Sequence, residues 1–181
     1  MIYVLLADGF EEVEAIAPID VMRRNNIEVK TAGVGGTQIC GAHSMTVIAD
    51  MKIEDINLDD VEGIILPGGM PGTLNLQKDE YVNKLIEHCR ENELLLAAIC
   101  AAPMILGELG ILEGKDAVCF PGFEEHLKGA DICDCPVAVC DNVITAKGAG
   151  AALEFGAAIV DYFSGEDGVG AKTLDTMQYP I

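Results

Sequence analysis

Three short apolar runs rich in β-forming residues constrain the fold of this chain more than any other feature. They lie at residues 2–7, 61–66 and 94–99. A continuous apolar run of this length predicts a strand that is buried on both faces, as in a parallel sheet. Helix-forming segments follow the runs, at 11–25, 79–92 and 101–109. The alternation predicts an α/β fold with a doubly wound, mostly parallel sheet and helices on both faces.

The rest of the chain completes this pattern. Residues 27–33 predict a further strand, 37–48 a short hairpin, and 148–163 a last helix. Residues 117–120, 137–140 and 143–145 predict short strands, the last two joined by a turn at Asp141-Asn142. Pro18 cannot donate a hydrogen bond to the carbonyl of Glu14, which predicts a bend in the first helix. With no repeat or linker, residues 1–181 are expected to form a single domain.

Charge and apolar content exclude several classes of protein. The chain has 30 acidic and 11 basic residues, a net charge of −19 that would repel a phosphate backbone or an anionic membrane surface. Neither nucleic acid nor membrane is therefore an expected partner. No basic segment precedes the first apolar run, so we expect a cytoplasmic protein without a signal peptide. The odd number of cysteines, 7, favours reduced thiols over a disulfide framework.

Cys100 lies where the third apolar run passes directly into small residues, in the segment LLLAAICAAP at 94–103. A sharp strand-to-helix turn places its central residue at the carboxyl edge of the sheet, where α/β proteins bind ligands. The first N–H groups of the following helix favour a thiolate, so Cys100 is predicted to be a nucleophile held in an elbow. The alternative is a cysteine that packs in the core as a small apolar residue.

Two other loops are predicted to meet Cys100 at this edge. Gly68 and Gly69, in PGGMPG, follow the second apolar run, and their backbone N–H groups can join that of Ala101 in stabilising an oxyanion. Glu14 opens the first helix; beside a thiolate it is predicted to stay protonated, donate to the sulfur and transfer a proton. The alternatives are a plain tight turn at the glycines and solvated carboxylates in the first helical turn.

Four segments in order, FEEVEAIAPIDVMRR, LPGGMPG, AAICAAP and GAGAALEFG, resemble the DJ-1/ThiJ/PfpI superfamily over essentially the whole chain. The resemblance is to its DJ-1-like branch, and it implies a flavodoxin-like fold, similar to class I glutamine amidotransferases, and a homodimer. It places Glu14 at the family's pocket glutamate and Cys100 at its reactive cysteine. Gly69 and Ala101 fall at the backbone donors. The resemblance implies neither a cofactor nor a metal.

The sequence departs from the family pattern at three positions. Ala101 stands where peptidase-like members have a histidine, so peptidase activity is not expected. Phe120 stands where DJ-1 has a histidine before a proline, and Ala102 replaces a glycine. The three histidines of the chain occupy neither family position and are interpreted as surface or structural residues: His43, His88 and His126. Cys100 and Glu14 are therefore expected to handle the protons without a histidine.

The resemblance implies a cysteine-dependent glyoxalase or deglycase that acts on small α-oxoaldehydes, such as methylglyoxal or glyoxal, or on their adducts. Cys100 would attack the aldehyde carbon, and Glu14 would move a proton between the two adjacent carbons. The alternative is a redox-sensing or chaperone-like stress protein in which Cys100 is oxidised without turnover.

Five further cysteines are interpreted from their sequence context. Cys133, Cys135 and Cys140, in ICDCPVAVC, resemble a thiolate cluster but lack the paired C-x-x-C of structural zinc sites, so no metal site is expected. Cys119 and Cys40 are predicted to be core or edge residues.

Overall fold

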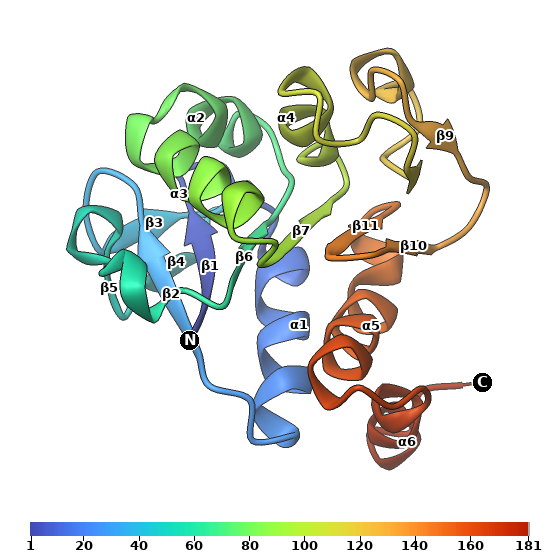
Figure 1. The fold of residues 1–181 in the computed structure, drawn as a ribbon. Helices are drawn as coiled ribbons and strands as arrows, with labels where there is room; N and C mark the ends of the chain where they lie inside the picture. Colours follow the sequence, from blue (N-terminus) through green and yellow to red (C-terminus); the bar gives the residue numbers. More distant parts are fainter. Residues whose placement is uncertain (181) are drawn as a thin grey trace.

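A seven-stranded sheet forms the centre of the protein in the computed structural model, which describes residues 1–180 (Figure 1). The strand order is β10-β11-β7-β6-β1-β2-β5, and only the β10–β11 pair is antiparallel. The order β2-β1-β6-β7-β11 is that of flavodoxin-like proteins, which confirms the predicted doubly wound α/β fold. The strands of this sheet are β1 Ile2–Leu6, β2 Val29–Gly33, β5 Met51–Lys52, β6 Gly63–Leu66, β7 Leu95–Ile99, β10 Val137–Cys140 and β11 Val143–Ala146.

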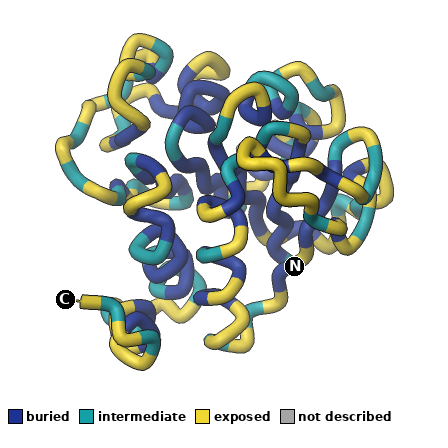
Figure 2. The backbone as a smooth tube through the Cα atoms, turned by 180° about the vertical axis from the view of Figure 1, so that it is seen from behind, coloured by how far each residue is buried: buried dark blue, intermediate teal, exposed yellow. Residues whose placement is uncertain are grey.

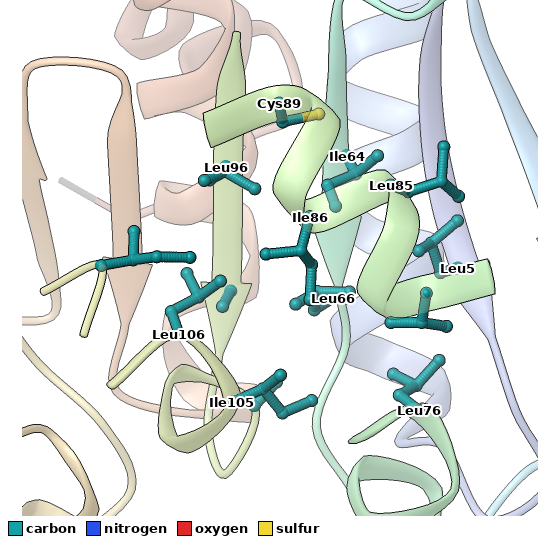
Figure 3. Close-up of a cluster of buried hydrophobic side chains, with 14 of the residues drawn as sticks. Leu5, Ile64, Leu66, Leu76, Leu85, Ile86, Cys89, Leu96, Ile105 and Leu106 are labelled. Carbon is teal, nitrogen blue, oxygen red and sulfur yellow. The ribbon is translucent and has the colours of Figure 1, made fainter. Parts of the chain in front are cut away.

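Helices cover both faces of the sheet and enclose two cores. Alternate residues of each strand point to opposite faces, so Leu5 enters one core while Val4 enters the other. Side chains of α2, α3 and α4 fill the first core, where Ile86 of α3 lies over the sheet (Figure 3). Side chains of α1, α5 and α6 fill the second. The helices are α1 Glu12–Arg24, α2 Gly72–Lys78, α3 Glu80–Glu91, α4 Pro103–Glu108, α5 Ala152–Ser164 and α6 Val169–Thr176.

Helix α1 brings Glu14 to the sheet edge. It starts with acidic residues and ends with basic ones, as the helix dipole favours. Pro18 lies inside α1, but the helix runs through it without interruption from Glu12 to Arg24. On the neighbouring helix α5, a Cβ at Gly156 would lie 2.9 Å from the Cα of Pro18. The glycine thus lets α5 pack closely against α1 at the proline.

The predicted hairpin is confirmed as an antiparallel pair, β3 Gln38–Cys40 and β4 Thr46–Ile48. The strand expected at 117–120 is shorter and lies outside the main sheet: β8 Asp116–Ala117 pairs with β9 Asp131–Ile132. The turn joining β10 to β11 is also confirmed, with Asp141 at a φ of 53°. Four elements have no counterpart in the sequence-based prediction, namely β5, α2, β9 and α6.

Burial follows the sheet. Figure 2 shows the central strands and the inner faces of the helices as buried, whereas the connections and outer helical turns are exposed. Across residues 1–180, no helix combines the length and apolar character needed to cross a membrane. Short 3-10 turns complete the connections, at Ile53–Asp55, Leu58–Asp60, Glu124–His126 and Ala149–Ala151.

Candidate active site

The candidate site lies at the carboxyl ends of β1, β6 and β7. Chain connections leave β1 and β6 in opposite directions, and ligand sites of open α/β sheets form at such a switch point. Backbone hydrogen bonds join the loop after β1 to the loop after β6. The Glu11 N–H donates to the Gly68 carbonyl at 2.9 Å, and the Gly72 N–H donates to the Gly9 carbonyl at 3.2 Å. The predicted convergence of the three loops is confirmed.

Cys100 is the joint between β7 and the turn into α4. Its φ of 65° lies in the left-handed region, which a non-glycine residue adopts only when its surroundings enforce it. Two hydrogen bonds enforce it here: the Cys100 N–H donates to the Ala146 carbonyl at 2.9 Å, and the Cys100 carbonyl accepts from the Phe120 N–H at 2.8 Å. The thiol is half-buried. This is the strained elbow that the sequence predicts.

Glu14 contacts the thiol of Cys100 from the first turn of α1. The residue is only 1% exposed, and its Oε2 accepts a hydrogen bond of 2.9 Å from the Gly68 N–H. A Cβ at Gly68 would lie 2.6 Å from both this oxygen and the Cys100 Cβ, so only glycine leaves room for the pair. The Gly68 N–H is thus occupied by Glu14 in this structure, and its predicted role as an oxyanion donor stays a prediction.

Gly69 and Ala101 direct their N–H groups at the sulfur. Both N–H groups favour the ionised form of Cys100, opposing the rise in its pKa. Gly69 has a φ of 89°, and a Cβ there would lie 2.4 Å from the Glu11 nitrogen. A side chain is therefore excluded at this position both by conformation and by space. The sulfur and the two donors together form a place where a negatively charged atom can be held.

Glu14 and Cys100 both have raised pKa values. Burial raises the pKa of Glu14 to about 7, although the Cys100 thiol and the Gly68 N–H oppose the rise. Burial and the negative charge of Glu14 raise the pKa of Cys100 to about 12. The two groups form one buried, hydrogen-bonded pair, and both shifts favour the protonated form, so the pair keeps at least one proton near neutral pH. A resting thiolate beside a protonated Glu14 stays a prediction.

Glu12 has a structural role that sequence reasoning missed. Its side chain is buried, not solvated, and its Oε1 accepts the His43 N–H at 2.8 Å. Its Oε2 lies 3.0 Å from Nδ1 of His43. Glu11 lies 3.5 Å from the same Nδ1, and the three side chains are the only His, Cys, Asp or Glu group in the described residues with metal-site geometry. The ion pair with the imidazole accounts for the arrangement, which fixes the β3–β4 hairpin to α1.

No histidine of residues 1–180 takes the place of the family's pocket histidine beside Cys100. His126 pairs with Glu108 at 3.0 Å, and His88 lies beside Asn92 on α3. Phe120 occupies the expected histidine position, 48% exposed, with its ring against Gly148. It lines an open cavity of about 640 Å³ together with Pro136, Lys147 and Tyr179, among others. No sequence pattern indicated this cavity.

Comparison with known proteins identifies the family. Residues 1–162 match the DJ-1/PfpI family. The chain belongs to this family. It is 34% identical over 167 residues to Protein DJ-1 homolog B of Arabidopsis thaliana, covering 90% of this chain but only 38% of that protein. It is 30% identical over 151 residues to a deglycase of Pyrococcus abyssi, covering 81% of this chain and 89% of that protein.

Solved structures agree with the fold. An oxidized DJ-1 of Toxoplasma gondii matches with a TM-score of 0.93 and 26% sequence identity, over 99% of this chain and 98% of that one. The family membership inferred from the four sequence motifs is therefore confirmed. The roles of Cys100, Glu14, Gly69 and Ala101 stay predictions, supported by the geometry described above.

Proposed function

We propose that this protein is a cofactor-independent glyoxalase or deglycase that uses Cys100 to act on small α-oxoaldehydes or their adducts. The contact between the Cys100 thiol and the buried Glu14 carboxyl carries the proposal. A pKa of about 7 makes Glu14 a base and an acid at physiological pH, which is what repeated proton transfer requires. The relative named a deglycase supports the same class of reaction.

With methylglyoxal, the reaction begins when ionised Glu14 takes the thiol proton as the Cys100 sulfur attacks the aldehyde carbon. Glu14 returns that proton to the new alkoxide, which gives a hemithioacetal and regenerates the carboxylate. The carboxylate then removes the hydrogen of the former aldehyde carbon while the neighbouring carbonyl oxygen takes up a proton, which gives an enediol. Glu14 delivers the hydrogen to that neighbouring carbon as the hydroxyl on the sulfur-bound carbon loses its proton and becomes the thioester carbonyl. The product is a lactyl thioester on Cys100, and water hydrolyses it to lactate and the free thiol. No net oxidation occurs, because one carbon is oxidised as the other is reduced.

Gly69 and Ala101 support the charged stages of this sequence. Their N–H groups already face the sulfur, and the alkoxide forms on the carbon bonded to that sulfur. Preorganised backbone donors of this kind are typically worth about 10²–10³ in rate. The mechanism therefore needs one side-chain acid/base and two backbone donors, all of which lie on the three loops at the switch point.

The test is incubation with methylglyoxal in the absence of glutathione and metal, with lactate as the measured product. We expect lactate from the wild type and none above background from Cys100→Ala. Undiminished activity of Cys100→Ala would exclude this mechanism. Free methylglyoxal and its preformed hemithioacetal with N-acetylcysteine, compared at equal total aldehyde, distinguish glyoxalase from deglycase activity.

A second candidate function is redox sensing or chaperone-like protection without turnover. A half-buried thiol next to Glu14 and two N–H donors also suits a sulfinate, since the donors and a protonated carboxyl stabilise its negative charge. The structural similarity to an oxidized DJ-1 favours keeping this candidate. We also propose that the protein is cytoplasmic and that its thiols are reduced, which is compatible with both functions. Mass spectrometry after mild peroxide treatment tests this second function. Preferential sulfinate at Cys100 would support it, and oxidation spread evenly over all cysteines would exclude a specially reactive Cys100.

We further propose that the protein forms a homodimer through the outer face of α1 and the adjoining hairpin. Exposed apolar side chains gather there: Val13 and Ile16 on α1, and Met45 and Ile48 on the hairpin. Ile16 and Ile48 line a common groove of about 300 Å³. Light scattering should give twice the chain mass for the wild type and the monomer mass for Ile16→Asp; a monomeric wild type would contradict the proposal.

A further inference from the structure

Two cysteines outside the active site lie together in the loop that joins β9 to β10 along the outer edge of the molecule (Figure 1). They are Cys133 and Cys135, separated by Asp134. In an extended segment, residues two apart point to the same side. The Cys135 side chain accordingly lies close enough to Cys133 to influence its thiol, which also donates to the Asp131 carbonyl at 3.6 Å, and both cysteines are partly exposed. A small oxidant therefore has access to two neighbouring thiols.

A cation lies beside this pair. Nζ of Lys147 is 3.0 Å from Oδ1 of Asp134, the residue between the two cysteines. Lys147 also lines two cavities, one of about 640 Å³ shared with Cys135 and one of about 220 Å³ shared with Cys133. The thiolate is the form that reacts with peroxide, and Lys147 offsets the negative charge of the carboxylate that lies between the two cysteines in sequence. Burial raises the pKa of the Cys133 thiol, and the negative charge of Asp116 adds to the rise.

The backbone allows the two sulfurs to join, under strain. Two residues of fully extended chain separate the Cα atoms by about 6.6 Å, close to the upper limit of about 6.8 Å for disulfides. Backbone hydrogen bonds of 2.9 Å hold the two ends of this loop, from the Cys133 N–H to the Ala117 carbonyl and from the Lys147 N–H to the Pro136 carbonyl. Asp134 and Cys135 between them belong to no strand, so the chain can bend there. A disulfide at such spacing is strained, and strained disulfides have high reduction potentials and reopen readily.

We propose that Cys133 and Cys135 form a second redox site, a reversible dithiol that peroxide converts to a disulfide independently of Cys100. One thiolate attacks hydrogen peroxide, becoming a sulfenic acid and releasing one oxygen as water. The second thiol displaces the sulfenic oxygen as another water, and the S–S bond forms. The protein loses two hydrogens and peroxide is reduced to two waters. Two equivalents of glutathione restore the thiols by exchange and leave as oxidised glutathione.

Cys140 provides a matched control. It lies at the end of β10, near Lys115 rather than near the other two cysteines. Trypsin cleaves after Lys128 and Lys147, so Cys133, Cys135 and Cys140 all fall on one peptide, residues 129–147. Substitution of each in turn shows which two carry the disulfide.

The experiment treats the full-length Cys100→Ala protein with stoichiometric hydrogen peroxide, followed by alkylation and mass spectrometry of peptide 129–147. We expect the peptide to lose two hydrogens and to take up one alkyl group instead of three. Cys140→Ser should keep the loss, and Cys133→Ser and Cys135→Ser should both abolish it. Glutathione should restore all three alkylation sites in the parent protein.

Three results would overturn the proposal. The peptide gains oxygen atoms instead of losing hydrogens, or the loss persists in Cys133→Ser or Cys135→Ser, or it disappears in Cys140→Ser. Circular dichroism of each variant before oxidation confirms that it is folded. If Cys133→Ser is misfolded, Cys133→Ala takes its place, and the same outcomes apply to it.

Discussion

Replacement of Glu14 by glutamine has a stability effect whose sign and size follow from the structure. The folded-state pKa of Glu14 is raised from 4.5 to about 7, and the residue is almost fully buried. The folded state therefore binds a proton more tightly than the unfolded chain does. The favourable contribution of this proton is complete below the unfolded pKa and is lost as pH rises through the folded one. Between pH ~5.5 and ~8 the loss amounts to about 2 kcal/mol by proton linkage.

Urea unfolding at these two pH values measures the effect, and both values avoid the isoelectric point near 4.2. Other carboxylates also titrate, so the informative quantity is the wild type's change in unfolding free energy minus that of Glu14→Gln. We expect wild type to lose about 2 kcal/mol more than the variant. Glu11→Gln is the control, because it removes a neighbouring carboxyl that does not contact the thiol. Equal pH dependence in wild type and Glu14→Gln would refute the assignment of the raised pKa.

The same variant separates catalysis from stability. Loss of a general acid/base typically lowers turnover by about 10²–10⁴, and we expect Glu14→Gln to lose more than tenfold. The ionised carboxyl also raises the pKa of Cys100, so Glu14→Gln should speed alkylation of that thiol by iodoacetamide at pH 8. Slower alkylation in the variant would support the alternative, a thiolate held by a protonated Glu14.

Three further substitutions test the framework around the pair. Gly68→Ala should nearly abolish aldehyde turnover, because its Cβ would lie 2.6 Å from the Cys100 Cβ and from Glu14; kinetics comparable to wild type would refute the packing argument. Glu12→Gln should cost about 1–3 kcal/mol in urea unfolding, since it weakens the charged hydrogen bonds to the hairpin; an unchanged midpoint would contradict this. Ile86→Ala should cost about 2–5 kcal/mol without changing kcat, as expected for a fully buried core residue far from the chemistry.

Patterns local in sequence predicted most of the fold. The runs that became β1, β6 and β7 are continuous and apolar because both faces of a central parallel strand are buried. The elements that escaped prediction carry weaker signals. Helix α2 begins at a glycine and has only 7 residues, and β5 and β9 have 2 residues each. Pairing with neighbours, which is a property of the tertiary structure, defines such short elements.

The sequence predicted which residues form the site better than it predicted which of them carries the proton. Cys100, Glu14 and Gly69 meet as expected because the carboxyl ends of parallel strands share an edge. Which group holds the proton depends on burial, and a sequence does not state how deeply Glu14 lies beneath the loops. For the same reason, the sequence did not indicate that the Gly68 N–H donates to this carboxyl. The contact of Glu12 with His43 spans 31 positions of sequence and left no local sign.

The most direct measurement for the central claim is the product of methylglyoxal turnover in deuterium oxide, analysed by nuclear magnetic resonance. The mechanism requires Glu14 to carry a hydrogen from one carbon to the next, so exchange of its proton with solvent introduces deuterium at the lactate C2. We expect deuterated lactate from wild type and from Glu11→Gln, and neither product nor label above background from Cys100→Ala. Lactate formed by Cys100→Ala at the wild-type rate would contradict the account.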